Sequence, residues 1–409
     1  MKQTLRLVVL VALALLAPIA AGAGPYTAVH VLGDSLSDQG NLFRATSLVT
    51  GQGLPASDHY FLGRFSNGEI YLDRLAERLG VASTPSLLGG NNYAFGGARA
   101  NYNIVENPPT PGGFPPGLFP WSLNRERQAF VARGVHDPGA LFIVFSGSND
   151  IGDLIGLTLM QGFNATKPAS DAAVEAVRQG ILAFIAAGAR DIVVPNVPDL
   201  ALDPLVFSRD PLPGQPPGSH LVANTATALA VRYNTALEAM LQQFTGVNII
   251  RFDMFSFVHR VVADPGAFGL ANVTQPCYTG FVTPAQPTDT VCSTPQVYLF
   301  WDAEHPTTVA HAILANEMLA AMQLTTLSHL QGLVDTLDVQ DEIQAALQAK
   351  LTAANDVLVD SDPDNNHAAA NILGAFINQV QAQRGKKISE SAADALIGRA
   401  RLLIQLLGV

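Results

Sequence analysis

Short apolar runs of strand length alternate with helical patterns between residue 26 and about residue 324. Each run is close to continuously apolar, which is typical of parallel strands that are covered by helices on both faces. Strands and helices in alternation predict a three-layer α/β domain with a parallel sheet, and such sheets bind ligands at the carboxyl ends of their strands. The strand-like runs lie at residues 28–32, 141–145, 192–195 and 248–252, and the helical patterns between them at residues 69–79, 172–187 and 225–244.

The character of the chain changes after Leu324. From there onward strand-like runs are absent, and apolar residues recur at helical spacing among good helix formers. Ser389 stands at a position suited to cap the last of these helices. We therefore predict an α/β domain at residues 24–324 and a separate, small all-α domain at residues 325–409.

The N-terminus has the pattern of a secretory signal peptide. Lys2 and Arg6 precede an apolar run at residues 7–17, and Ala-Gly-Ala at residues 21–23 matches a small-residue cleavage site. We expect residues 1–23 to be removed and the mature protein to be exported, either extracellular or periplasmic. A retained membrane anchor is the alternative, although the run is short for a membrane span. No later stretch is long and apolar enough to cross a bilayer, so no integral membrane segment is expected after cleavage.

The overall charge excludes one class of partner. The formal net charge is −11 at pH 7. Nucleic-acid binding needs clustered lysine and arginine side chains to neutralise phosphates. We therefore expect no nucleic-acid partner.

The two cysteines, Cys277 and Cys292, lie 15 residues apart in a loop rich in proline and threonine. An exported protein meets an oxidising compartment, so we expect them to form a disulfide. Closing a loop of this size would stabilise the fold by about 3 kcal/mol. Their spacing does not match a metal site, and no metal is expected.

Two segments far apart in the chain supply the residue types of a nucleophilic hydrolase. Ser35 follows the first strand-like run, on what we expect to be a tight turn, and Asp302 stands three residues before His305. A serine hydroxyl is a weak nucleophile until a base takes its proton, and an imidazole does this best when a carboxylate orients it. The sequence therefore offers Ser35 as nucleophile, His305 as base and Asp302 as the residue that orients the base.

An attacked ester also develops a negative oxygen, which needs fixed hydrogen-bond donors. Gly96 and Gly97 form a pair whose backbone N–H groups can approach a substrate closely, and Asn149 follows the second strand-like run. With the N–H of Ser35, one of these glycines and the Asn149 amide would form an oxyanion hole. The choice between the glycines stays open, with Gly97 slightly preferred.

Four segments follow one another along the chain: Gly33-Asp34-Ser35-Leu36, Gly96-Gly97, Gly147-Ser148-Asn149-Asp150 and Asp302-Ala303-Glu304-His305. In this order they resemble the motifs of the GDSL family of lipases and esterases, also called SGNH hydrolases. The resemblance covers roughly residues 26–324 and implies a flavodoxin-like fold, no cofactor, and the same roles for Ser35, Asp302 and His305. A further segment, Gly63-Arg64-Phe65-Ser66-Asn67-Gly68, is similar to a motif of larger family members.

The C-terminal helices resemble a second family. Residues 375–388 are similar to the FIMAH domain, which is appended to many secreted bacterial hydrolases. The resemblance implies an accessory role, binding a surface or a polymer, and no catalytic residue.

Together these features predict an exported serine esterase or lipase that acts through an acyl-enzyme on a small-molecule or lipid ester. A carbohydrate O-acetylesterase is one alternative, with the same chemistry on a sugar-bound acetyl group and a preference for acetyl over longer chains. The other is a non-enzymatic binding protein on a hydrolase fold, which would keep its function in a Ser35→Ala variant.

Overall fold

The computed structural model describes residues 25–100, 122–359 and 365–409, so the expected signal peptide at residues 1–23 lies outside the described residues. The main sheet has four parallel strands, and the predicted strand-like runs are confirmed to within one residue at each end. In spatial order the strands are β1 (Val29–Gly33), β2 (Leu141–Phe145), β3 (Asp191–Pro195) and β4 (Asn248–Phe252).

A further segment extends the sheet beyond β1. Asn92 forms an isolated parallel bridge with Val31, and Tyr93 N donates a hydrogen bond to Val31 O at 2.8 Å. This segment lies between β1 and β2 in the chain. When it is counted as the second of five strands, numbered along the chain, the spatial order is 2-1-3-4-5, which is the flavodoxin-like order. The predicted fold class is therefore confirmed. The second segment and β2, which follow β1 in the chain, lie on opposite sides of β1. Such a reversal in strand order makes the carboxyl end of β1 the expected ligand position.

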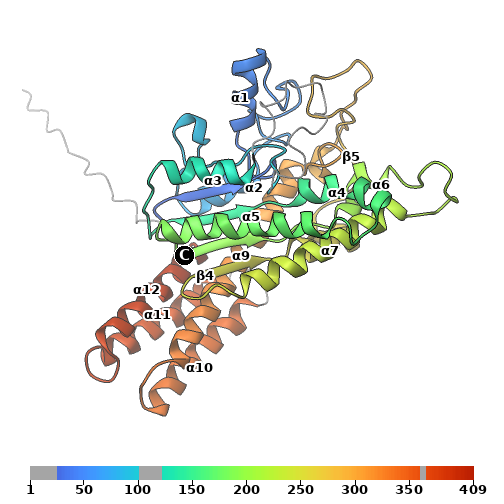
Figure 1. The fold of residues 1–409 in the computed structure, drawn as a ribbon. Coiled ribbons are helices and arrows are strands. Elements are labelled where there is room, and N and C mark those ends of the chain that lie inside the picture. Colours follow the sequence, from blue (N-terminus) through green and yellow to red (C-terminus); the bar gives the residue numbers. More distant parts are fainter. Residues whose placement is uncertain (1–24, 101–121, 360–364) are drawn as a thin grey trace, which may run out of the picture.

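Helices cover both faces of the sheet and form the outer two of three layers (Figure 1). Successive strand side chains point to opposite faces, so Phe142 and Val144 lie in one apolar core while Ile143 and Phe145 lie in the other. The first core is closed by α3 (Leu123–Ala132), α4 (Ser148–Gln161), α5 (Lys167–Ala186) and α7 (Leu221–Leu241). The second is closed by α2 (Tyr71–Arg78), α8 (Met254–Ala263) and α9 (Thr308–Asp335).

The predicted helices are present, but their ends differ from the pattern. Helix α7 begins four residues earlier than predicted, at Leu221. Both carboxylate oxygens of Asp210 accept backbone hydrogen bonds there, from Val222 N at 2.9 Å and Ala223 N at 2.8 Å. A cap supplied from outside the helix leaves no signal in the helical pattern itself.

Smaller elements complete the α/β domain. A two-stranded parallel sheet pairs β5 (Asn272–Pro276) with β6 (Tyr298–Phe300). The others are α1 (Asn41–Thr50), η1 (Ser86–Leu88), η3 (Leu200–Leu202), α6 (Pro204–Phe207), η4 (Pro265–Phe268) and η5 (Pro295–Val297).

The C-terminal region is helical, as predicted, and has a core of its own. Helix α9 continues through residue 324, where we predicted a domain boundary, and its second part packs with the three helices that follow (Figure 1). Ser389 caps the last helix as predicted, because its Oγ accepts a hydrogen bond from Ala392 N at 3.2 Å. These helices are α10 (Asp341–Leu358), α11 (Asn365–Gln383) and α12 (Glu390–Leu407).

Helix α12 also docks against the α/β domain. Arg399 Nη1 donates to Asp191 Oδ1 at 2.6 Å, and Gln323 Nε2 donates to Leu406 O at 2.8 Å. Leu406 belongs to the core under α9. Asp191 is the first residue of β3, so this contact lies at the amino ends of the strands, away from the edge where the strands end. Among the described helices, none has the length and hydropathy needed to span a membrane.

Candidate active site

The proposed nucleophile lies on the tight turn that follows β1. Gly33 ends the strand, and a Cβ there would lie 2.8 Å from Phe145 O, so no larger residue fits. The turn is closed by Ser37 N, which donates to Asp34 O at 3.0 Å, and by Leu36 N, which donates to Asp34 Oδ1 at 3.1 Å. Asp34 thus holds the turn through its backbone carbonyl and its side chain. These bonds present Ser35 at the carboxyl edge of the sheet.

Asp302 and His305 lie on a second turn, just beyond β6. Asp302 Oδ1 accepts hydrogen bonds from the backbone N–H groups of Glu304 at 2.9 Å and His305 at 2.8 Å, which fixes the loop around the carboxylate. Trp301 N donates to His305 O at 2.7 Å and closes the turn. The sequence spacing of three residues is thus the spacing that lets one carboxylate hold both the backbone and the ring of the histidine.

The structure brings the three predicted residues into one hydrogen-bonded chain. His305 Nδ1 lies 2.8 Å from Asp302 Oδ2, and His305 Nε2 lies 3.1 Å from Ser35 Oγ. All three side chains are buried or nearly so. This is the arrangement in which an imidazole takes a proton from a serine hydroxyl while a carboxylate orients it.

Burial and neighbouring charges set the ionisation of this chain. Burial alone would lower the pKa of His305, but the charges of Asp302, Glu304 and Asp34 outweigh it and raise that pKa above its ordinary value. Burial would raise the pKa of Asp302, but the charge of His305 and the hydrogen bonds from His305 and Tyr60 lower it. Asp302 therefore stays ionised, as an orienting carboxylate must.

The structure separates the two candidate oxyanion glycines. Gly96 N donates to Asp38 Oδ2 at 2.8 Å, so its hydrogen is already engaged. Gly97 N and Ser35 N have no hydrogen-bond acceptor among the described residues. Gly97 adopts a φ of +72°, a conformation that favours glycine. Of the pair, Gly97 is therefore the residue whose backbone N–H is not engaged by another described residue.

Asn149 lies beside this glycine loop, on the first turn of α4. Its Nδ2 donates to Ala98 O at 3.0 Å, which uses one of the two amide hydrogens. The glycine loop is in turn tied to the nucleophile turn, because Phe95 N donates to Gly33 O at 3.3 Å. Gly147, before the helix, has a φ of +126°, and a Cβ there would lie 2.5 Å from the Tyr233 ring.

The sequence did not predict one residue that connects the parts of this site. Glu126, on α3, is completely buried, and its two carboxylate oxygens accept from Gly33 N at 2.8 Å and Phe95 N at 3.2 Å. It therefore joins the nucleophile turn to the glycine loop. Burial, with Asp34 and Asp38 nearby, raises its pKa well above the ordinary value. The only sequence signal is an acidic residue in the first turn of a helix, which ordinarily indicates a favourable charge at a solvated helix end.

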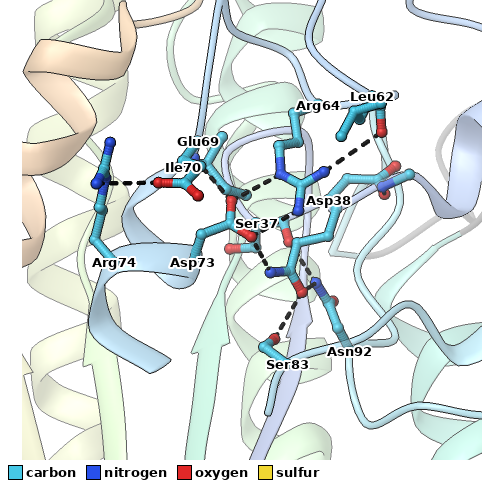
Figure 2. Close-up of polar contacts among 12 residues, drawn as sticks. Ser37, Asp38, Leu62, Arg64, Glu69, Ile70, Asp73, Arg74, Ser83 and Asn92 are labelled. Carbon is cyan, nitrogen blue, oxygen red and sulfur yellow. Dashed lines mark hydrogen bonds and ion pairs between the residues drawn. The ribbon is translucent and has the colours of Figure 1, made fainter. Parts of the chain in front are cut away.

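The segment at residues 63–68 is anchored beside the nucleophile turn, as Figure 2 shows. Arg64 forms a two-pronged ion pair with Asp73, with both N···O distances 2.7 Å. Asp73 also accepts a hydrogen bond from Gln39 Nε2 at 2.6 Å, and Gln39 Oε1 accepts one from Asn92 Nδ2 at 3.0 Å. This network ties the segment to the loop that follows Ser35 and to the edge of the sheet.

The other end of the same segment holds the histidine loop. Ser66 Oγ donates to Pro306 O at 2.9 Å, and Asn67 Oδ1 accepts from Thr308 N at 2.8 Å. The Phe65 ring lies 4.9 Å from the His305 ring, between centroids. The segment thus connects the loop that carries Ser35 with the loop that carries the base.

The expected disulfide is confirmed. Cys277 and Cys292 are bonded, with their Cα atoms 4.8 Å apart. The loop that they close places Phe281 with its ring centroid 5.9 Å from that of His305. In the part of the chain that the structure describes, no group of three or more His, Cys, Asp or Glu side chains is arranged to hold a metal ion.

Comparison with known proteins agrees with this geometry. Residues 29–318 match the family model of the GDSL-like lipase/acylhydrolases, and residues 325–405 match the FIMAH domain. A phosphatidylcholine-sterol acyltransferase of Aeromonas hydrophila is 26% identical over 332 residues, which cover 71% of this chain and 88% of that protein. A GDSL esterase/lipase of Arabidopsis thaliana is 25% identical over 329 residues, covering 72% and 88%.

A third relative, the esterase EstA of Pseudomonas aeruginosa, is 28% identical over 387 residues, which cover 83% of this chain and 54% of that protein. The family model spans most of the chain and contains the segments that carry Ser35, Gly97, Asn149, Asp302 and His305. The chain therefore belongs to the GDSL-like lipase/acylhydrolase family of carboxylic ester hydrolases and carries a C-terminal FIMAH domain.

Proposed function

We propose that this protein hydrolyses carboxylic esters through an acyl-serine intermediate, with Ser35 as nucleophile, His305 as general base and Asp302 as its orienter. The observation that carries the proposal is the continuous chain from Ser35 Oγ through His305 to Asp302, with distances of 3.1 Å and 2.8 Å. Nucleophile and base lie within hydrogen-bond reach before any substrate binds, which is the geometry that this reaction needs.

In the first half of the reaction, Ser35 Oγ attacks the ester carbonyl carbon as His305 Nε2 takes its proton. The carbonyl oxygen becomes negative, and we assign its donors as Ser35 N–H, Gly97 N–H and the second hydrogen of Asn149 Nδ2. The bond to the alcohol oxygen then breaks, and His305 returns its proton to that oxygen.

In the second half, His305 removes a proton from water, and the resulting hydroxide attacks the acyl-serine. The tetrahedral intermediate uses the same donors. It collapses to release the carboxylic acid, and the proton on His305 returns to Ser35 Oγ. The substrate is a small-molecule or lipid ester.

We also propose that residues 1–23 are a signal peptide and that the protein acts outside the cytoplasm, in the periplasm or the medium. The support is the charge and hydropathy pattern of those residues. In this proposal the helical region is an accessory domain that binds a surface or a polymer, and its support is the match of residues 325–405 to the FIMAH domain. Its contact between Arg399 and Asp191 lies at the amino edge of the sheet, away from Ser35.

The test is hydrolysis of p-nitrophenyl esters from acetate to palmitate by the mature protein and its Ser35→Ala variant. We expect at least a 10³-fold loss of kcat in the variant. Ser148→Ala is the matched control, because it removes a neighbouring serine hydroxyl that has no partner among the described residues. Activity that survives Ser35→Ala would refute the mechanism, and activity confined to acetate would favour the O-acetylesterase alternative.

A further inference from the structure

Tyr60 contacts the acid of the proposed triad from a distant part of the chain. Its hydroxyl donates to Asp302 Oδ2 at 2.6 Å, and the same oxygen lies 2.8 Å from His305 Nδ1. The backbone donors to this carboxylate, from Glu304 and His305, belong to its own turn. Tyr60 is 242 residues away in sequence and shares with His305 the oxygen that faces the imidazole.

The Tyr60 hydroxyl is held in place by buried packing. The side chain is 3% exposed and packs in a cluster with Cys277, Tyr278 and Trp301. Its ring meets the Tyr278 ring edge-on, with centroids 6.0 Å apart, and Tyr278 N donates to Trp301 O at 2.6 Å. The disulfide at Cys277 closes the loop that carries this cluster. The hydroxyl thus has a fixed position relative to the Asp302 turn.

The charges around Tyr60 also fix its direction of donation. Burial and the charge of Asp302 raise the pKa of Tyr60 far above its ordinary value. The hydroxyl therefore stays protonated at any pH at which the enzyme works and always donates to the carboxylate. The other titratable groups that face Asp302 or His305 are Asp34 on the nucleophile turn, Asp203 before α6, Glu304, His311 on α9 and Tyr278.

We propose that Tyr60 is a positioning residue that sets the basicity of His305 through Asp302. A hydrogen bond to the carboxylate draws negative charge away from the imidazole and so limits how strongly Asp302 favours the protonated ring. It also fixes the rotation of the carboxylate, which decides how well Oδ2 lines up with His305 Nδ1. The inference rests on the proposed function in assigning His305 as the base.

The experiment replaces Tyr60 with phenylalanine, which keeps the ring and removes the hydroxyl. We expect the midpoint of the acid limb of kcat/KM against pH to move upward by about half a unit to one unit, because the lost donor leaves more charge on Asp302. The pKa of the His305 ring is measured in parallel by NMR on protein with labelled histidine, with its signal assigned from a His305→Gln variant.

Tyr278→Phe is the matched control. It removes a hydroxyl from the same buried cluster, but that hydroxyl points to Asp289 Oδ2, 3.4 Å away. An upward shift in Tyr60→Phe and none in Tyr278→Phe supports the proposal. An unchanged or lowered His305 pKa in Tyr60→Phe refutes it and leaves Tyr60 a packing residue.

The NMR titration needs no turnover. If the wild-type protein hydrolyses no ester, the proposed function fails, while the ring pKa still decides whether Tyr60 acts on His305 through Asp302.

Discussion

The side chain of Asp34, on the nucleophile turn, is buried, and we expect its charge to destabilise the fold by a measurable amount. Its Oδ1 accepts one hydrogen bond, from Leu36 N, and its Oδ2 has no partner among the described residues. Mainly because of burial, its pKa is raised from 3.8 to about 7. The folded protein therefore holds this proton more tightly than the unfolded chain does. The associated stability is complete below about pH 4 and is lost as the pH rises through about 7.

The Asp34→Asn variant removes this charge and keeps an oxygen to accept from Leu36 N. A shift of about three units, at about 1.4 kcal/mol for each, corresponds to about 4 kcal/mol. We therefore expect the variant to match the wild type in free energy of unfolding at pH 4 and to exceed it by about 4 kcal/mol at pH 8.

The assay is denaturant unfolding of both proteins at pH 4, 6 and 8, with the disulfide intact. Asp171→Asn on α5 is the control, because Asp171 is half-exposed and pairs with exposed Lys167, so its effect should stay within about 0.5 kcal/mol at every pH. A gain for Asp34→Asn that is equal at pH 4 and pH 8 would refute the reasoning, as would a loss at pH 8.

Three further outcomes are expected. Asn149→Ala should lower kcat about 10²- to 10³-fold with little change in KM in p-nitrophenyl ester kinetics, because it removes a donor needed mainly by the transition state. A rise in KM with kcat unchanged would contradict that role. The kcat/KM of the wild type should rise with pH through a midpoint above 6.5, because Asp302 and its neighbours raise the pKa of His305 and the base must be neutral; a midpoint below 6.5 would contradict this. Arg399→Ala should lower the free energy of unfolding by about 2–3 kcal/mol in denaturant titrations, since it leaves the buried Asp191 carboxylate without its cation. Arg260→Ala, which breaks an exposed ion pair with Glu317, should lower the free energy of unfolding by less than about 1 kcal/mol.

The strands and the three residues of the proposed triad were predictable because their signals are local. A strand buried on both faces is apolar throughout, as β2 is, and β2 matches its predicted bounds. The bounds of β4 also match, although its Arg251 is exposed. The Asp302 turn is likewise local, since the carboxylate holds the backbone N–H of the histidine three residues later. Interactions of this kind join residues that are close in sequence, so a local pattern can predict them.

The sequence favoured Gly97 over Gly96 only slightly, because the contact that distinguishes the two N–H groups comes from a distant residue. Both glycines have the same freedom in sequence, but Asp38, 58 residues earlier, accepts the N–H of Gly96. The Tyr60 contact with Asp302 has the same character, at a separation of 242 residues. Neither pair has a spacing that a local pattern can reveal.

Glu126 joins β1 to the second segment of the sheet through its carboxylate. Beyond the bridge at Val31, Phe95 N divides its hydrogen bond between Gly33 O at 3.3 Å and Glu126 Oε1 at 3.2 Å, and Gly33 N donates to Glu126 Oε2 at 2.8 Å. A carboxylate offers two oxygens and can accept from both segments at once, whereas glutamine offers one oxygen and would aim an N–H₂ group at the other donor. The raised pKa of Glu126 is a consequence of burying this acceptor beside Asp34. Glu126 lies 93 residues from Gly33 and 31 residues from Phe95, so the fold brings these groups together and no local motif predicts the contact.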